Sequence, residues 1–220
     1  MAAYVTRLRT LRANLSRLHN FSLLGGEEAN TRPGEFPGIP AKTPLDPGKI
    51  VLICRGQMDG PALYGCLRET YHLQPEMCGP SYVLCMTTIA DTDEGFGRLA
   101  EAMEEIDKIV YAGTQEKEKQ AIEGYEKREE NGFSFAKTTL PPVACPIYEA
   151  AEAFREAVPL EEANGRVAAA YVLLYPPDAP LIIPGEVFSM TKILEIQKYL
   201  RLGLSVPGIE AGEMVWVLKD

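Results

Sequence analysis

The chain has 220 residues, of which 46% are hydrophobic and 24% charged, a balance typical of a globular protein with one large or two small domains. Its formal net charge is −9 and its pI about 4.9, which argues against a nucleic-acid partner because phosphate backbones are bound by clustered Lys and Arg. No run approaches the roughly 20 apolar residues of a membrane span, and the first 21 residues lack the apolar core of a signal peptide.

The cysteines are five in number, and most of them stand within apolar runs. An odd number of such cysteines predicts buried thiols in a reducing cytoplasm. There is no Cys-x-x-Cys pair, and His19 and His72 are the two histidines of the chain. A zinc site made of Cys66, His72 and Cys78 is an alternative, but we expect no metal site.

The first predicted element is a helix that spans residues 4–21. Apolar side chains recur there at steps of three and four, and arginines occupy the other faces: Tyr4, Leu8, Leu11, Leu15, Leu18 and Phe21 form the apolar stripe. This helix begins without an N-cap residue, as if it continued from something upstream. Residues 25–48 are rich in Gly and Pro and are predicted to form a loop.

An alternation of strands and helices is predicted next. Residues 49–54 form a short apolar run typical of a buried strand, and Asp59 and Pro61 predict the start of a helix over residues 60–70. Two strands are expected over residues 73–77 and 82–88, followed by a helix over 94–107. The order β-α-β-β-α predicts a small α/β layer with helices packed on one face.

The remaining chain is predicted to contain a charged connector and a second domain. Residues 116–130 are almost wholly polar, with interleaved charges, which indicates a solvated helix. Helices are then expected over 146–157 and 189–202, and strands over 169–175 and 214–218. We therefore predict an α/β (α+β) protein of three parts: a small α/β domain over 1–110, a helical connector over 111–139 and an α+β domain over 140–220.

The most distinctive segment is Tyr175-Pro176-Pro177-Asp178-Ala179-Pro180-Leu181-Ile182-Ile183-Pro184-Gly185-Glu186. Its prolines keep the chain extended, and they cannot take part in the ladder of a central strand. We therefore expect a rigid segment that positions Glu186 just before a helix. One interpretation is that Glu186 lies in the first turn of that helix, where the dipole favours a carboxylate. The other is that Glu186 faces a substrate.

This segment, preceded by Val158-Pro159-Leu160-Glu161-Glu162-Ala163-Asn164-Gly165-Arg166, resembles the C-terminal domain of the ornithine/lysine/arginine decarboxylase family. Upstream, Lys49-Ile50-Val51, Gly79-Pro80-Ser81-Tyr82 and Asp91-Thr92 resemble, in the same order, the small aminotransferase-like domain of that family. Asp178-Ala179 departs from the family pattern, which has Gly followed by Ile or Val.

The resemblance implies a role for Glu186 as a substrate-binding residue. In the family the final Glu of the motif is expected to reach an active site at a dimer interface and to contact the distal cationic group of a basic amino acid. A carboxylate that meets an ammonium or guanidinium group makes a strong, charge-assisted hydrogen bond. Asp178 is close in sequence and could add negative charge.

The resemblance also implies pyridoxal phosphate as the cofactor of the completed enzyme, which acts in polyamine metabolism. Such enzymes need a lysine that holds the cofactor, and the family presents it after a histidine, in a large domain that precedes the region resembled here. His19 is followed by Asn20 and His72 by Leu73. We therefore expect no catalytic or cofactor-binding residue in this chain, no activity of the chain alone, and a partner that carries the cofactor domain.

Two alternatives remain. The chain could be a non-enzymatic truncated paralogue that binds and regulates an intact decarboxylase, with the apolar stripe of residues 4–21 as its docking face. The run Leu160-Glu161-Glu162-Ala163-Asn164-Gly165-Arg166-Val167 also resembles the start of molybdopterin-biosynthesis proteins of the gephyrin type, but their Ser-x-Met-Asp-Gly motif does not follow it. A homo-oligomer is expected in either decarboxylase interpretation.

Overall fold

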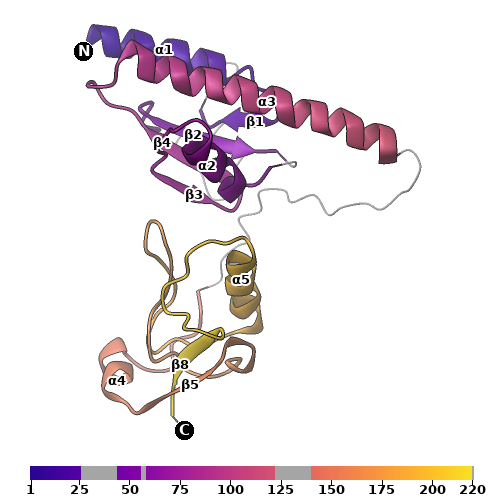
Figure 1. Ribbon diagram of the computed structural model, residues 1–220. Helices are drawn as coiled ribbons and strands as arrows, with labels where there is room; N and C mark the ends of the chain where they lie inside the picture. The colour runs from indigo at the N-terminus through magenta and orange to yellow at the C-terminus, as the bar shows by residue number, and fades with distance from the viewer. Residues whose placement is uncertain (26–43, 56–57, 122–139, 220) are drawn as a thin grey trace. The chain divides into compact units, whose positions relative to one another are not determined.

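The computed structural model describes residues 1–25, 44–55, 58–121 and 140–219, and it describes no side chains over 114–121. The chain divides into two compact units, Met1–Ala136 and Lys137–Asp220, which we describe one at a time (Figure 1). Both units combine helices with small antiparallel sheets. The predicted α+β class is therefore confirmed.

The sheet of the first unit has four antiparallel strands in the order β1-β2-β4-β3. The strands are β1 (Phe21–Leu23), β2 (Lys49–Cys54), β3 (Met77–Gly79) and β4 (Tyr82–Met86). In β2, Ile50 and Leu52 are fully buried, as the apolar run predicted. The strand expected over 73–77 is wrong, since β3 begins only at Met77 and pairs with β4 through Met77 and Leu84.

Two helices of the first unit, α1 (Ala2–Leu15) and α3 (Asp93–Ala121), pack side by side (Figure 1). The apolar stripe of α1 is buried in this contact and in the core below it: Leu8, Leu11 and Leu15 are each at most 5% exposed. From α3, Phe96 and Met103 enter the same core. The proposal that the stripe is an exposed docking face is therefore wrong.

The end of α1 is set by a contact made far along the chain. Asp107, on α3, is 6% exposed and accepts hydrogen bonds from the backbone N–H groups of His19 (2.9 Å) and Asn20 (2.7 Å). The Asn20 side chain also donates to this carboxylate, at 3.1 Å. These bonds hold residues 19 and 20 out of helical geometry, so the helix predicted to reach Phe21 ends at Leu15 and Phe21 enters β1 instead.

Helix α2 (Gly60–Glu69) begins where the sequence predicted. The Asp59 carboxylate accepts the N–H of Ala62 at 2.8 Å and so caps the helix. A Cβ on Gly60 would come within 2.0 Å of the Gly79 carbonyl oxygen, which is why the helix can approach the end of β3 so closely. Leu63 and Leu67 of α2 are fully buried.

Arg12 holds together two ends of chain that are far apart in sequence. Its guanidinium donates to the carbonyls of Leu24 (3.0 Å) and Gly25 (2.8 Å), and also to the carbonyl of Pro47 (3.2 Å). The loop predicted over residues 25–48 falls mostly on residues 26–43, which lie outside the described residues. The two ends of this segment are thus fixed on the same side chain of α1.

Helix α3 extends beyond the end expected at residue 107. It is continuous to Ala121, and so it includes the beginning of the charged segment predicted as a separate connector. The rest of that segment, residues 122–139, lies outside the described residues. None of the helices in the described part of the chain is long and apolar enough to cross a membrane.

The second unit is built from short elements around one core. They are α4 (Ile147–Glu152), β5 (Arg155–Pro159), a 3-10 turn (Leu160–Glu162), β6 (Val172–Leu174), β7 (Ala179–Ile182), α5 (Met190–Arg201) and β8 (Met214–Leu218). Strand β5 pairs with β8 and β6 with β7, both antiparallel. Side chains from all these elements except α4 and β5 supply the buried centre: Leu160, Val172, Ile182, Phe188, Ile193, Ile196, Val215 and Val217.

The predictions for the second unit were partly confirmed. Strand β8 and helix α5 lie where expected, and Ser189 caps α5 by accepting the N–H of Lys192 at 3.2 Å. The helix expected over 146–157 is shorter, because the chain leaves α4 after Glu152 to form β5. The one tryptophan of the sequence, Trp216 on β8, donates to Glu210 at 2.6 Å and packs under Arg155.

Candidate functional site

The proline-rich segment forms one arm of a hairpin. Strand β7 pairs with β6, and Pro180 stands opposite Leu173 in this two-stranded ladder. The ladder is irregular between Val172 and Leu173, and no strand among the described residues pairs with the outer edge of β7, so a residue without an N–H is tolerated. Asp178 is exposed at the tip of the hairpin, with a positive φ of 66°. Because β7 extends for four residues from there, at about 3.3 Å per residue, Asp178 lies at the opposite end of the strand from Glu186.

Beyond β7, the segment that carries Glu186 lies between two other stretches of backbone. On one side, Ala144 N–H donates to the Gly185 carbonyl and Val187 N–H to the Pro142 carbonyl, both at 2.8 Å. On the other side, Ala168 N–H donates to the Glu186 carbonyl, also at 2.8 Å. We call residues 142–145 the strap. Glu186 is therefore held by backbone hydrogen bonds from both neighbours, which fixes its position.

Gly185 is required for this arrangement. Its φ is +91°, a region that side chains rarely adopt. A Cβ at this position would lie 2.2 Å from the carbonyl oxygen of Cys145 in the strap. Glycine therefore allows the strap to approach the backbone immediately before Glu186.

The Glu186 side chain is half-buried, and one of its oxygens is already engaged. Ile183 N–H donates to Glu186 Oε2 at 2.9 Å. Helix α5 begins only at Met190 and is capped by Ser189, so Glu186 is not in its first turn. The helix-dipole interpretation is therefore wrong, and the local role of the carboxylate is to close the turn over residues 183–186.

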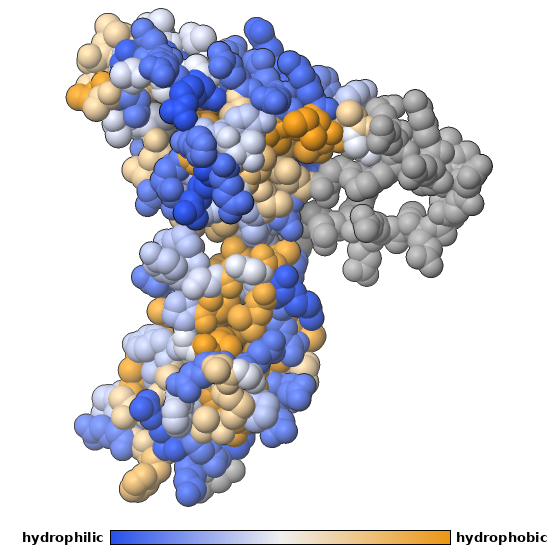
Figure 2. Space-filling view, in the orientation of Figure 1, coloured by the Kyte–Doolittle hydropathy of each residue, from blue (hydrophilic) through white to orange (hydrophobic). Residues whose placement is uncertain are grey.

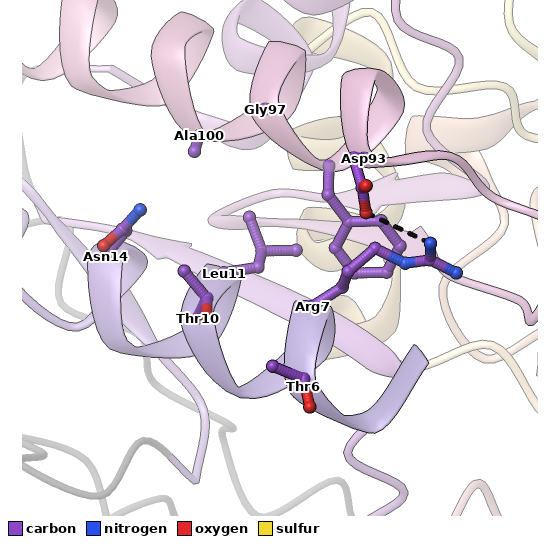
Figure 3. Close-up of a pocket in the computed structure, with 9 residues that line it drawn as sticks. Thr6, Arg7, Thr10, Leu11, Asn14, Asp93, Gly97 and Ala100 are labelled. Carbon is purple, nitrogen blue, oxygen red and sulfur yellow. Dashed lines mark hydrogen bonds and ion pairs between the residues drawn. The ribbon is translucent and has the colours of Figure 1, made fainter. Parts of the chain in front are cut away.

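A second candidate is a hollow in the first unit, with a volume of about 270 Å³. It lies between α1 and α3, and Figure 3 shows that residues of both helices line it. Arg7 donates to Asp93 at 3.1 Å at one end, so the two charges at this end neutralise each other. The other lining residues are uncharged, including Thr10, Asn14 and Ala100. Nothing in this hollow pairs a nucleophile with a base or gathers ligands for an ion.

The described residues do not offer a place for pyridoxal phosphate. Lys192 is the buried lysine among them, and its Nζ donates to Glu195 at 2.7 Å. Its amine is thus engaged by a carboxylate, and no lysine lines the hollow between α1 and α3. A lysine that carries the cofactor must be free to bond to it, and the contact with Glu195 leaves Lys192 unsuited to this role.

Metal and thiol chemistry find no support in the part of the chain that the structure describes. No three His, Cys, Asp or Glu side chains there come together as metal ligands, so Cys66, His72 and Cys78 do not form the alternative zinc site. The five cysteines are free thiols. Burial raises the pKa of Cys54 and of Cys85 to about 12, which keeps both thiols protonated and unreactive at neutral pH.

Exposed apolar side chains are numerous in the second unit. Figure 2 shows hydrophobic residues gathered on its visible face. In and next to the strap, Leu140 is 85% and Val143 68% exposed, and Tyr148 of α4 is 66% exposed. Sequence reasoning did not single out the strap, because its residues show no strand period and the contact with Gly185 joins positions about 40 residues apart. The glycine before Glu186 was the signal that another backbone approaches there.

Comparisons with known proteins agree with this arrangement. A family model described as the C-terminal domain of Orn/Lys/Arg decarboxylase matches residues 120–211. An arginine decarboxylase of Bacillus subtilis (strain 168) is 30% identical over 189 residues, which are 84% of this chain and 36% of that protein. An arginine decarboxylase of Bacillus anthracis is 28% identical over 180 residues, with 80% and 33% covered.

Solved structures show the same fold. A lysine decarboxylase of Francisella novicida matches all of this chain over 40% of its own, with a TM-score of 0.70 and 16% identity. The constitutive lysine decarboxylase of E. coli matches 99% of this chain over 40% of its own, with a TM-score of 0.67 and 20% identity.

The chain thus spans about a third of the length of the curated relatives it matches. The matched C-terminal domain contains the strap, the proline-rich hairpin and Glu186. The resemblance stated from the sequence is confirmed. Residues 120–211 thus match the C-terminal domain of the Orn/Lys/Arg decarboxylase family, and the chain is similar in sequence and in fold to the C-terminal part of these decarboxylases.

Proposed function

We propose that this chain supplies substrate-pocket and dimer contacts to a pyridoxal-phosphate-dependent decarboxylase of basic amino acids, with Glu186 as the residue that binds the distal cation of the substrate. The observation that carries the proposal is the fixed position of Glu186, which the strap, residues 166–168 and the Ile183 N–H hold in place. A carboxylate held in this way loses little conformational entropy when it accepts a cation.

The cofactor lysine would come from a partner, either a chain that carries the cofactor domain or an intact decarboxylase. Pyridoxal phosphate supplies the electron sink for loss of the α-carboxylate. This chain would bind and orient the substrate's far end. The division into 1–110, 111–139 and 140–220, the homo-oligomeric state and the cytoplasmic location are also parts of this proposal. The free cysteines support the last of these, because thiols stay reduced in the cytoplasm.

The first experiment is native mass spectrometry of the protein purified gently from its own cells, combined with an absorbance scan for a lysine-bound pyridoxal cofactor. A complex with a second chain that carries the cofactor is the expected result. A colourless monomer or homodimer would contradict the proposal and favour the alternative, a non-enzymatic paralogue that regulates an intact decarboxylase.

The role of Glu186 is tested by Glu186→Gln in the assembled enzyme. Loss of one charged hydrogen bond is expected to lower kcat/KM for lysine, ornithine or arginine roughly 10- to 100-fold, mostly through KM. Glu162→Gln, an exposed glutamate of the same unit, is the matched control and should leave kcat/KM unchanged. Equal values for both variants would remove Glu186 from the substrate site.

A further inference from the structure

Val143 of the strap is the direct cross-strand partner of Glu186. The two residues form an antiparallel bridge. The hydrogen bonds of this bridge, Val187 N–H to Pro142 O and Ala144 N–H to Gly185 O, both at 2.8 Å, flank the pair and do not join Val143 to Glu186. This is the non-hydrogen-bonded type of pair, in which the Cα atoms are about 4.5 Å apart and the side chains are closest.

The side chains of such a pair project from the same face of the ladder. Val143 is 68% exposed, so its methyl groups are accessible beside the half-buried Glu186 carboxylate. Glu186 Oε2 accepts the Ile183 N–H at 2.9 Å, and within the described residues no hydrogen bond to Oε1 is found. One face of the ladder therefore presents a half-buried carboxylate, with one oxygen outside the Ile183 hydrogen bond, next to an apolar, β-branched side chain.

We propose that Val143 is a specificity-determining residue of the Glu186 site: its methyl groups pack on the methylene carbons that adjoin the ligand's terminal cation. The pair then recognises an alkylammonium or alkylguanidinium group as one unit, with Glu186 binding the charge and Val143 the carbon chain. A bare cation can satisfy only the first contact. This inference rests on the proposed function, since it assumes that Glu186 binds a cation.

Two reporters on the full chain test the inference by NMR. The Ile183 amide responds when the Glu186 carboxylate is engaged, because it donates to that group. The Val143 methyl groups respond to contact with the carbon chain. Cadaverine is expected to shift both signals saturably, whereas ammonium chloride at matched ionic strength should shift the Ile183 amide alone. Glu186→Gln should remove both responses.

The substitution Val143→Thr keeps the β-branched shape and replaces a methyl by a hydroxyl. It should raise the Kd for cadaverine about fourfold, the effect of losing one buried CH₂-sized contact. Val51→Thr, on a half-buried strand valine of the first unit, is the matched control and should leave this Kd unchanged.

The outcomes separate the two proposals. If cadaverine shifts the Ile183 amide but not the Val143 methyl groups, or if Val143→Thr binds as tightly as the native chain, the role of Val143 is overturned and that of Glu186 stands. If neither reporter responds to cadaverine at tens of millimolar, the role of Val143 is overturned, and the kcat/KM of Glu186→Gln in the assembled enzyme decides the role of Glu186.

Discussion

The two units of the chain achieve a fixed structure in different ways. In the first, long amphipathic helices bury whole stripes of side chains, such as Leu8, Leu11 and Leu15, against a continuous four-stranded sheet. In the second, three- to five-residue strands pair two by two, and isolated backbone contacts such as the strap on Gly185 complete the structure. The fold of the first unit is therefore determined mainly by the periodic spacing of its apolar side chains. The fold of the second unit is determined mainly by backbone contacts between segments that are distant in sequence.

The largest expected effects come from filling a close backbone approach in each unit. Gly185→Ala in the second unit and Gly60→Ala in the first each place a Cβ about 2 Å from a carbonyl oxygen. Each should destabilise its own unit by about 3 kcal/mol or more. Trp216 fluorescence reports unfolding of the second unit, and amide exchange of Ile50 and Leu52 reports the first.

Two glycines with open space serve as controls for this pair. Gly165 has a φ of +81°, but a Cβ added there would meet nothing within 4 Å, so Gly165→Ala should cost only about 1–2 kcal/mol of backbone strain. Gly65, inside α2, also has open space, and Gly65→Ala should be neutral or stabilise the helix by up to about 1 kcal/mol. Similar losses in all four variants would show that close approach is not what distinguishes the sites.

Acid should weaken the first unit through Asp107. Burial alone would raise the pKa of this carboxyl, but the hydrogen bonds donated by His19 and Asn20 outweigh it and lower the pKa below its ordinary value. The stabilisation is therefore full above the unfolded pKa of about 4 and is lost as the pH falls through the lower, folded pKa.

The substitution Asp107→Asn should cost about 1–3 kcal/mol at pH 7 and flatten this acid dependence. Both effects are measured as the free energy of unfolding in urea between pH 2 and 7, with amide exchange of β2 as the signal. Glu101→Gln, an exposed change on the same helix, should reproduce the native curve. A native-like acid limb in Asp107→Asn would assign the pH dependence to other groups.

The smallest of these effects concerns the helix caps, one in each unit. Asp59→Ala removes the acceptor for Ala62 N–H, and Ser189→Ala the acceptor for Lys192 N–H. Each should cost about 1 kcal/mol in its own unit, measured with the same two reporters. A loss of stability in both units from either change would mean that they unfold as one.

Prediction from the sequence succeeded where a residue pattern is local. The apolar run of residues 49–54, the cap at Asp59 and the strand over 214–218 coincide with β2, α2 and β8. It failed where a distant contact decides the outcome. Leu18 and Phe21 continue the helical spacing of α1, yet Asp107, almost 90 residues away, binds the N–H groups between them and ends the helix early.

The candidate site shows the same division. Glu186 was found from the proline-rich motif and the family resemblance, both of which are readable along the chain. The strap was not found, because the hydrogen bonds between residues 142–144 and 185–187 connect segments without a shared period. Val143 therefore became a candidate only once its pairing with Glu186 was seen.

The hydrogen bonds of Arg12 have a practical consequence for engineering. Its guanidinium fixes the backbone at Leu24, Gly25 and Pro47, so the two ends of the intervening segment are anchored independently of its length. Substitution of this one side chain, as in Arg12→Ala, would therefore release the backbone at both positions at once, so engineered forms of the chain should keep Arg12.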